Sequence, residues 1–298
     1  MTCPACTAEM PETDAFCEEC GVALAPAANG CPKCGAAKDD EGFCAACGFR
    51  DITPAQDRIA IEISSHFAGV TDRGRRHSSN EDFLVLSETA RHRVMVVCDG
   101  VSSSQDAMLA SKAAAEAAAS SIAAGRSMQQ AVADALAAVV KLPAPLTDTD
   151  PPSTTLVAAR IKGARVEIAW AGDSRAYWIS AGGSRQLTVD DSWLNDMIAS
   201  GQMSTKEAMA SKNAHAITKW LGRDVGELEA SFLEFEMPGP GVLLLCSDGL
   251  WNYAQQLKDI EDLLGTPTQA LSTAHKLVDY ANARGGVDNI TAALWINQ

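Results

Sequence analysis

The chain has few basic residues and no long apolar run, and both shortages limit what it can do. Its 298 residues hold 24 Lys and Arg against 38 Asp and Glu, which gives a net charge of −14. Binding to a nucleic-acid backbone depends on Lys and Arg, so this balance argues against a nucleic-acid partner. No stretch approaches the roughly twenty apolar residues of a membrane-spanning helix, so we expect no membrane partner either.

The start of the chain, Met-Thr-Cys-Pro-Ala-Cys, also lacks the features of a signal peptide. We therefore expect a cytoplasmic protein, in which cysteines stay reduced. The composition, 47% hydrophobic and 21% charged, is that of an ordinary globular protein. The length allows one large domain and a small appendage.

Eight of the ten cysteines lie before residue 48, in four Cys-x-x-Cys pairs. The segment is an internal repeat, in which Cys-Pro-x-Cys followed by Phe-Cys-x-x-Cys-Gly occurs twice. Four thiolates at short spacing suit tetrahedral Zn²⁺, and so small a unit needs the metal in order to fold. We predict two closed structural Zn²⁺ sites, one per repeat; ligands shared between the repeats and a disulfide framework are the alternatives. The predicted ligands are Cys3, Cys6, Cys17, Cys20, Cys31, Cys34, Cys44 and Cys47.

A polar linker at 49–57 joins this zinc-binding segment, 1–48, to a second domain at 58–298. Strand-like runs occur near 59–68, 94–98, 154–160, 165–170, 175–179, 242–246 and 290–297. Helical patterns cover 107–124, 127–140, 192–200, 204–211 and 268–284. Strands in blocks, divided by a helical pair and closed by a late helix, indicate an α+β sandwich.

Five acidic side chains at strand-end positions are the most informative feature of the second domain. Asp99 and Asp248 end apolar runs, where an unpaired charge is costly. The others are Glu81 and Asp82, in Asn-Glu-Asp, and Asp288, in Asp-Asn-Ile-Thr. Several carboxylates brought together would suit a shared hard cation, Mg²⁺ or Mn²⁺. Taken singly, each could instead be a turn or cap residue, since Asp-Gly is a common turn dipeptide.

Short motifs in the second domain occur in the order found in a known family. They are Thr71-Asp72-Arg73-Gly74, Asn80-Glu81-Asp82, Val97-Cys98-Asp99-Gly100, Thr154-Thr155-Leu156, Gly172-Asp173-Ser174-Arg175, Leu187-Thr188-Val189-Asp190, Ser247-Asp248-Gly249-Leu250 and Asp288-Asn289-Ile290-Thr291. Through them the chain, from about residue 58 to its end, resembles the metal-dependent serine/threonine protein phosphatases of the protein phosphatase 2C type. The resemblance implies a four-layer α-β-β-α sandwich of two antiparallel sheets flanked by helices, here preceded by the small double zinc-ribbon domain.

The resemblance also implies a two-metal site in a cleft at one end of the sandwich. Asp99 would bridge two Mn²⁺ or Mg²⁺ ions, and Asp248 and Asp288 would complete the ligands of the first ion. The second ion would bind the Gly100 carbonyl, with Glu81 acting through bound water and Asp82 a further candidate for the same role. Two such ions lower the pKa of a bridging water, so that hydroxide attacks the phosphorus.

Asp173 is a candidate ligand of a third ion. In the family, a weaker third metal can lie between the aspartates that match Asp173 and Asp248. The alternative is that Asp173 pairs with a nearby arginine at a turn. We expect Arg175 to be a structural ion-pair residue and Asp190 a turn residue.

The chain departs from the family pattern at two places. Three positions before Asn80 the family commonly has an arginine that binds the substrate phosphate, and here the residue is His77. His77 could donate to a phosphoryl oxygen or protonate the leaving oxygen, or it could be a surface histidine. After Gly100 the usual glycine pair is replaced by Val101-Ser102-Ser103-Ser104, which changes the loop but removes no predicted ligand.

The segment at about 190–227 occupies the place of the family's flap, a variable element beside the active site. Its methionines suit adaptable contacts or the flap's own small core. Lys219 and Arg223 are candidate contacts to the peptide around a phosphosite.

These features predict a phosphoprotein phosphatase that removes phosphate from Ser or Thr, with Asp99, Asp248 and His77 as catalytic residues. The resemblance implies that its substrates are targets of a Ser/Thr kinase. The zinc ribbons would serve docking or regulation through a protein partner. The alternative is a non-catalytic phosphatase-like scaffold that binds partners through the ribbons.

Overall fold

A computed structural model describes residues 58–143 and 150–298, together with Cys31, Cys34, Ala36, Cys44, Ala46 and Cys47. The chain divides into two units, Met1–Gln56 and Asp57–Gln298. The linker predicted at 49–57 lies outside the described residues, as do four predicted zinc ligands, Cys3, Cys6, Cys17 and Cys20. Among the residues that are described, no helix combines the length and the apolar character needed to cross a membrane.

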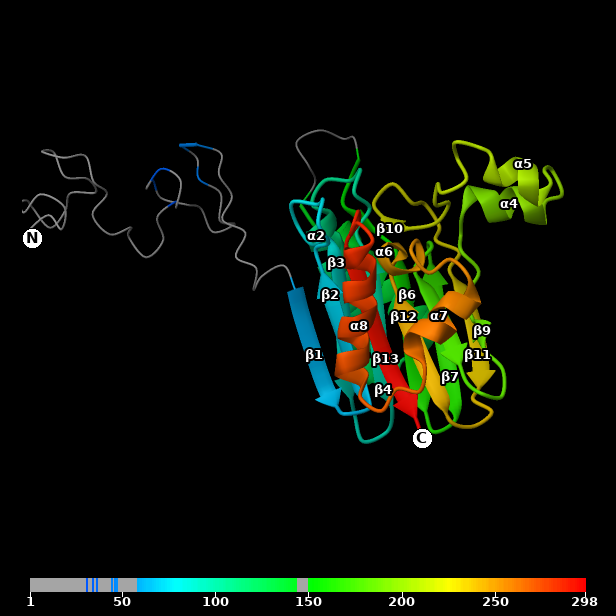
Figure 1. Cartoon of the computed structure of the whole chain (residues 1–298). Coiled ribbons are helices and arrows are strands. Elements are labelled where there is room, and N and C mark those ends of the chain that lie inside the picture. Colours follow the sequence, from blue (N-terminus) through cyan, green and yellow to red (C-terminus); the bar gives the residue numbers. More distant parts are fainter. Residues whose placement is uncertain are drawn as a thin grey trace, which may run out of the picture. The chain divides into compact units, whose positions relative to one another are not determined.

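Two antiparallel sheets form the body of the second unit (Figure 1). The larger sheet has, in spatial order, Arg58–Ser64 (β1), Phe67–Asp72 (β2), Ile290–Asn297 (β13), Gly241–Cys246 (β12), Arg175–Ile179 (β8) and Arg185–Gln186 (β9). The smaller sheet has Ser231–Glu236 (β11), Arg165–Ala171 (β7), Leu156–Lys162 (β6), Arg93–Asp99 (β4) and Asp82–Glu88 (β3). A separate short pairing joins Ser153–Thr154 (β5) to Leu221–Gly222 (β10).

Alternation along the central strands explains the layers. In β4, Val94, Val96 and Cys98 pack against helices, while Met95 and Val97 pack against the other sheet. β12 is divided between two clusters in the same way. A strand whose two faces are both covered must be apolar at successive positions, which is why these segments stand out in the sequence.

Helices cover the outer face of each sheet. Ala107–Ala123 (α2) and Met128–Val140 (α3) pack on the smaller sheet through a face made largely of alanine, a strong helix former. Leu257–Leu264 (α7) and Ala270–Ala283 (α8) pack on the larger sheet, in front of it in Figure 1. The unit is therefore a four-layer α-β-β-α sandwich, and the predicted α+β fold is confirmed.

Two short helices lie apart from the sheets. Trp193–Ala199 (α4) and Thr205–Met209 (α5) fall within the predicted flap and project beyond the sandwich in Figure 1. Each begins after a serine whose side chain accepts a hydrogen bond from the first helical turn.

The structure corrects some predicted elements. The run near 59–68 is not one strand but a hairpin, in which β1 and β2 are joined by a turn at Ser65-His66. Two further strands, β3 and β11, are not among the predicted elements, and they lie at the two edges of the smaller sheet. Edge strands are partly exposed and therefore carry a weaker apolar run. The short helix Asp248–Trp251 (α6) and α7 were omitted as well.

Leu245 is fully buried in the layer between the two sheets. We expect Leu245→Ala to lower the free energy of unfolding by about 2–5 kcal/mol, because the lost methyl groups leave a cavity. Phe232→Ala, at a β11 side chain that is 41% exposed, is the control and should change it by about 0.5 kcal/mol. Chemical denaturation followed by circular dichroism measures both, and equal losses would contradict the assigned layers.

Candidate metal centres

Strand ends from both sheets meet at one end of the sandwich and bring the acidic residues together. Asp82 begins β3 and Asp99 ends β4, and the two residues pair directly across the ladder. Asp248 begins α6 immediately after β12. Asp288 lies just before β13, the strand that neighbours β12. Residues far apart in the sequence are thus placed at one site by the sheet order.

Asp82 is the buried anchor of this site and is 2% exposed. Its Oδ2 accepts hydrogen bonds from Ser247 Oγ and Thr291 Oγ1, both at 2.7 Å, which join β3 to the larger sheet. Thr291 N also donates to Ser247 Oγ at 2.9 Å. Burial raises the pKa of Asp82 to about 7, and the two hydroxyl donors oppose that shift. Asp82 is therefore fixed where the two sheets meet, and its Oδ2 is already used by the two hydroxyls.

Asp99 lies among the other carboxylates. Its carboxyl group affects the pKa of both Asp82 and Asp248, so the three groups are neighbours. Burial raises the pKa of Asp99 well above its usual range, and the charges of Asp82, Asp248, Asp173 and Asp288 raise it further. Burial, with the charges of Asp173 and Asp288, raises the pKa of Asp248 in the same way. These carboxylates are close enough to repel one another strongly.

Two threonines fix the backbone at Asp99-Gly100. The Asp99 carbonyl accepts from Thr154 Oγ1 at 2.9 Å and from Thr155 N at 2.7 Å. Asp99 N donates to Thr155 Oγ1 at 3.2 Å. Gly100 is required because a Cβ there would lie 2.8 Å from the carbonyl oxygen of Glu81. The sequence motif contained both threonines, but sequence reasoning gave them no role.

Asn289 fastens the loop before β3 to the Asp288 turn and is 2% exposed. Its Nδ2 donates to the carbonyl oxygens of Arg73 (2.7 Å) and Ser79 (3.0 Å), and its Oδ1 accepts from Glu81 N at 2.7 Å. Sequence reasoning missed this residue as well. The only signal was its place in Asp-Asn-Ile-Thr, next to a predicted ligand.

His77 lies beside a predicted metal ligand. Its Nε2 is 3.2 Å from Oδ1 of Asp288, and the same oxygen accepts from Asn289 N at 2.8 Å. Arg73 donates to the carbonyl oxygen of His77. The imidazole is therefore positioned to orient Asp288.

Asp173 lies on the turn between β7 and β8. Arg175 does not form a salt bridge with it but pairs with Asp190, with Nη2 2.6 Å from Oδ2, and stacks on Trp251 at 3.6 Å from the ring centre. Trp251 Nε1 donates to the Asp173 carbonyl at 2.9 Å. Burial, with the charge of Asp190, raises the pKa of Asp173 to about 6. The carboxylate of Asp173 in turn raises the pKa of Asp248, so the two are neighbours.

The two candidate peptide contacts in the flap make internal contacts instead. Lys219 Nζ lies 2.9 Å from Oδ1 of Asp191. Arg223 Nη2 donates to the carbonyl oxygens of Val140 and Leu142, at 2.9 and 2.7 Å. Lys219 is therefore paired within the flap, and Arg223 joins the flap to the end of α3. Contact of either side chain with a substrate stays a prediction.

The carboxylate group is chemically suited to divalent cations. Glu81 Oε2 and Asp82 Oδ1 are buried oxygens with no hydrogen-bond partner within the described part of the chain. Such oxygens are unfavourable to bury unless a cation or water satisfies them. The side-chain donors are all oxygens, which suits Mg²⁺ or Mn²⁺.

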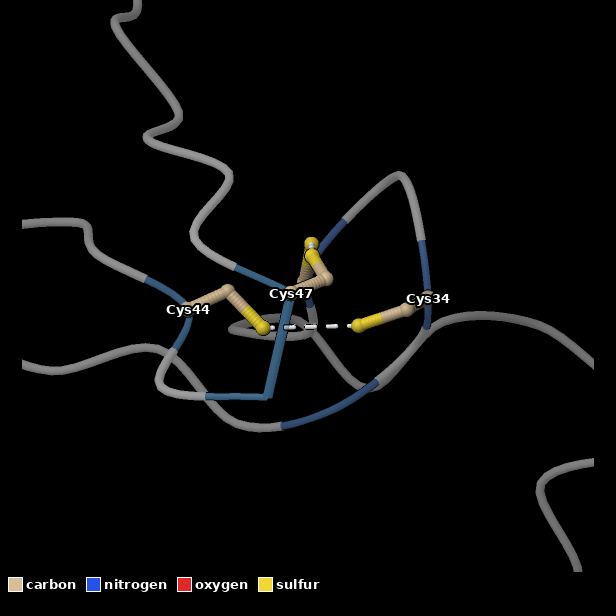
Figure 2. A group of neighbouring side chains, drawn as sticks. Cys34, Cys44 and Cys47 are labelled. Atoms are coloured by element: carbon tan, nitrogen blue, oxygen red, sulfur yellow. Dashed lines mark hydrogen bonds between the residues drawn. The ribbon is translucent and has the colours of Figure 1, made fainter.

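A second group of possible ligands lies in the N-terminal unit. Cys31, Cys34, Cys44 and Cys47 place their sulfur atoms within 4.8 Å of one another, and Figure 2 shows the last three converging. The Cys34–Cys44 and Cys31–Cys47 sulfur distances are 3.4 and 3.6 Å. A disulfide would need about 2.05 Å, whereas Zn–S bonds of about 2.3 Å in a tetrahedron give about 3.8 Å. The cluster is therefore suited to zinc, with all four ligands from the second repeat.

Comparisons with known proteins point to two families. The family model described as Protein phosphatase 2C matches residues 71–282, and the model described as Double zinc ribbon matches residues 3–48. The serine/threonine phosphatase stp of Listeria innocua is 30% identical over 235 residues, which is 75% of this chain and 92% of the relative. The stp phosphatase of Listeria welshimeri is 36% identical over 141 residues, which is 47% of this chain and 55% of the relative.

Solved structures show the same fold. The S. agalactiae serine/threonine phosphatase superposes with a TM-score of 0.65 at 26% identity, over 76% of this chain and 97% of that one. The catalytic domain of the serine/threonine phosphatase PstP, solved in complex with two manganese ions, gives a TM-score of 0.64 at 25% identity, over 81% of this chain and 100% of that one.

The cysteine cluster leads to a test by metal analysis. We expect about two zinc ions per purified chain, one for each set of four cysteines. Cys34→Ser should lower the content to about one, because an alcohol is a far poorer zinc ligand than a thiolate. Cys98→Ala, at a buried cysteine of β4 outside the cluster, is the control and should keep two. Unchanged zinc in Cys34→Ser would rule out the site.

Proposed function

Because the chain belongs to the protein phosphatase 2C family, with a double zinc ribbon preceding the family domain, we propose that it is a metal-dependent phosphatase acting on phosphoserine and phosphothreonine in proteins. The observation that carries the proposal is the position of Asp99, Asp248 and Asp288, which lie at the ends of strands that meet at one end of the sandwich. Three carboxylates from three separate segments are difficult to account for unless they share cations.

The motifs suggest how the ions would be held. Asp99 would bridge two Mn²⁺ or Mg²⁺ ions, Asp248 and Asp288 would complete the first, and the Gly100 carbonyl with Glu81 would hold the second. When bound, such a pair supplies a hydroxide nucleophile from water near neutral pH and neutralises the phosphoryl oxygens. A phosphate monoester carries close to two negative charges at pH 7, so this neutralisation is essential in so acidic a protein.

The chain's own residues keep the oxygens in place. Thr154 and Thr155 hold the Asp99 backbone, and Asp82 connects the two sheets behind it. His77 would orient Asp288, and its ring could also donate to the phosphate or to the leaving oxygen. Asp173, next to Asp248, would hold a third ion.

A non-catalytic scaffold is the competing function. Buried oxygens of Glu81 and Asp82 without a hydrogen-bond partner in the described residues are a poor arrangement for a protein that never binds cations. This favours the enzyme.

The zinc ribbons, whose four-thiolate sites would leave no ligand position open, would serve docking or regulation through a protein partner. The proposal includes the zinc-ribbon domain at 1–48, the linker at 49–57 and the phosphatase domain at 58–298, with the flap at about 190–227.

Asp248→Asn is the central test. We expect Mn²⁺-dependent hydrolysis of an aryl phosphate and of a phosphothreonine peptide to fall by more than about 100-fold, since a neutral amide is a much weaker ligand for a divalent cation than a carboxylate. Asp262→Asn, at an exposed carboxylate of α7 paired with Lys258, is the control and should keep full activity. Turnover by the natural chain without any divalent cation, or normal turnover by Asp248→Asn, would contradict the proposal.

His77 has two possible roles that separate by experiment. If it orients Asp288, His77→Ala should raise the Mn²⁺ concentration for half-maximal activity by about 10-fold. If it faces the phosphate, His77→Arg should raise kcat/KM for phosphate monoesters, because arginine binds phosphate in a bidentate manner. His66→Ala, at the far edge of the larger sheet, is the control. No change in either His77 variant would make the residue a bystander.

A further inference from the structure

A cavity of about 430 Å³ opens between the sandwich and the segment that returns from the flap. One wall is formed by the loop that departs from the family pattern, including Val101 and Ser104, and by Asp150. The opposite wall is formed by Ile217, Trp220 and Asp224 from the end of the flap. The two-metal assignment uses none of these residues.

The cavity adjoins the carboxylate site. Val101 follows Gly100 directly, and consecutive Cα atoms lie about 3.8 Å apart. Val101 N donates to the Ser153 carbonyl at 3.0 Å, and Ser153 pairs with Gly222 in the short β5–β10 ladder. Both walls are therefore tied to one pair of strands next to the site. A peptide whose phosphorylated side chain lay at the carboxylates would pass along this cavity.

The cavity has a negative lining. Among the described residues, its lining includes two carboxylates, those of Asp150 and Asp224, and one histidine, His215, but no Lys or Arg. The nearest cations of the flap are used elsewhere, since Lys219 pairs with Asp191 and Arg223 donates to backbone carbonyls at the end of α3. The negative charge is therefore available to a ligand.

An aromatic face accompanies this charge. Trp220 Nε1 donates to Asp224 Oδ1 at 3.1 Å, so that the indole is held next to the carboxylate. A carboxylate beside an indole attracts a Lys or Arg side chain through both charge pairing and cation–π contact. A neutral or acidic side chain gains neither interaction.

We propose that this cavity is a specificity subsite for a Lys or Arg side chain of the phosphoprotein substrate. The inference rests on the proposed function and adds the substrate class, namely phosphosites with a basic residue nearby. An extended peptide spans about 3.3 Å per residue. Because Val101 of the cavity directly follows Gly100 of the carboxylate site, the basic residue lies within a few positions of the phosphorylated Ser or Thr.

Phosphothreonine peptides test the proposal on the full chain with Mn²⁺. In an otherwise neutral peptide, a single Arg or Glu is placed in turn at each position from −4 to +4. At one or two adjacent positions, kcat/KM with Arg should exceed that with Glu by about 5–20-fold, and the ratio should shrink at high salt. Equal kcat/KM for Arg and Glu at every position overturns the proposal.

Variants of the cavity sharpen the test. Asp224→Lys should invert the preference, so that the Glu peptide becomes the better substrate, and Asp224→Asn should reduce the ratio to below about twofold. The control, Asp262→Asn, removes an exposed carboxylate of α7 and should keep the natural ratio. Because the ratio compares two peptides on one enzyme, partial misfolding lowers both rates and leaves it unchanged. A natural ratio in both Asp224 variants overturns the proposal.

Failure of the proposed function gives a different result, which is no turnover of either an aryl phosphate or any peptide. The cavity is then tested by binding. Non-hydrolysable phosphonate analogues of the Arg and Glu peptides are titrated in Mn²⁺ and followed by fluorescence anisotropy. Tighter binding of the Arg analogue by a similar factor supports the subsite, and equal affinities overturn it.

Discussion

Repulsion among buried carboxylates at one end of the sandwich is the constraint on which the rest of the second unit depends. Burial and four neighbouring acidic groups all disfavour the charged form of Asp99. Such a group stays in place only if the surrounding structure holds it there. The hydroxyls of Ser247 and Thr291 donate to Asp82, and Asn289 fastens the loop before β3. These hydrogen bonds thus hold the carboxylates at the positions where the proposed cations would neutralise them.

The two-sheet scaffold supplies the rigidity that this arrangement needs. β4 and β12 lie in the interior of their sheets and are covered on both faces, so their ends are fixed by packing over their whole length. Asp99 ends β4 and Asp248 follows β12, separated from it by Ser247. The buried apolar part of each strand therefore fixes the position of the carboxylate at its end.

This link between a buried strand and the carboxylate at its end also explains how much of the fold and of the site could be predicted from the sequence. The apolar runs of β4 and β12 and the acidic residues at their ends were visible, and so were the cysteine repeats, because each is a local pattern. The hairpin of β1 and β2 was predicted as one strand, since its turn, Ser65-His66, lacks Gly and Pro. The pairing of His77 with Asp288 and the role of Asn289 join segments some 210 residues apart in the sequence. No local pattern contains contacts of that kind. The internal contacts of Lys219 and Arg223 could not be predicted for the same reason, because a free and an internally paired cation look identical in a sequence.

The acidic surface repels a negatively charged substrate, whereas the proposed cation site attracts its phosphate. A phosphorylated segment carries negative charge toward a protein with a net charge of −14, and under the proposed function the cations held by the carboxylates would attract it. Surface repulsion is screened beyond about 8–10 Å, so it acts mainly during the final approach. A basic residue near the phosphosite would offset that repulsion at the cavity lined by Asp150 and Asp224, while the cations hold the phosphate. The phosphate and the basic side chain of the substrate, a few residues apart, would then bind the cations and the acidic cavity, which are separated by the loop Val101–Ser104. Under this proposal, the loop that departs from the family pattern would help to select the substrate.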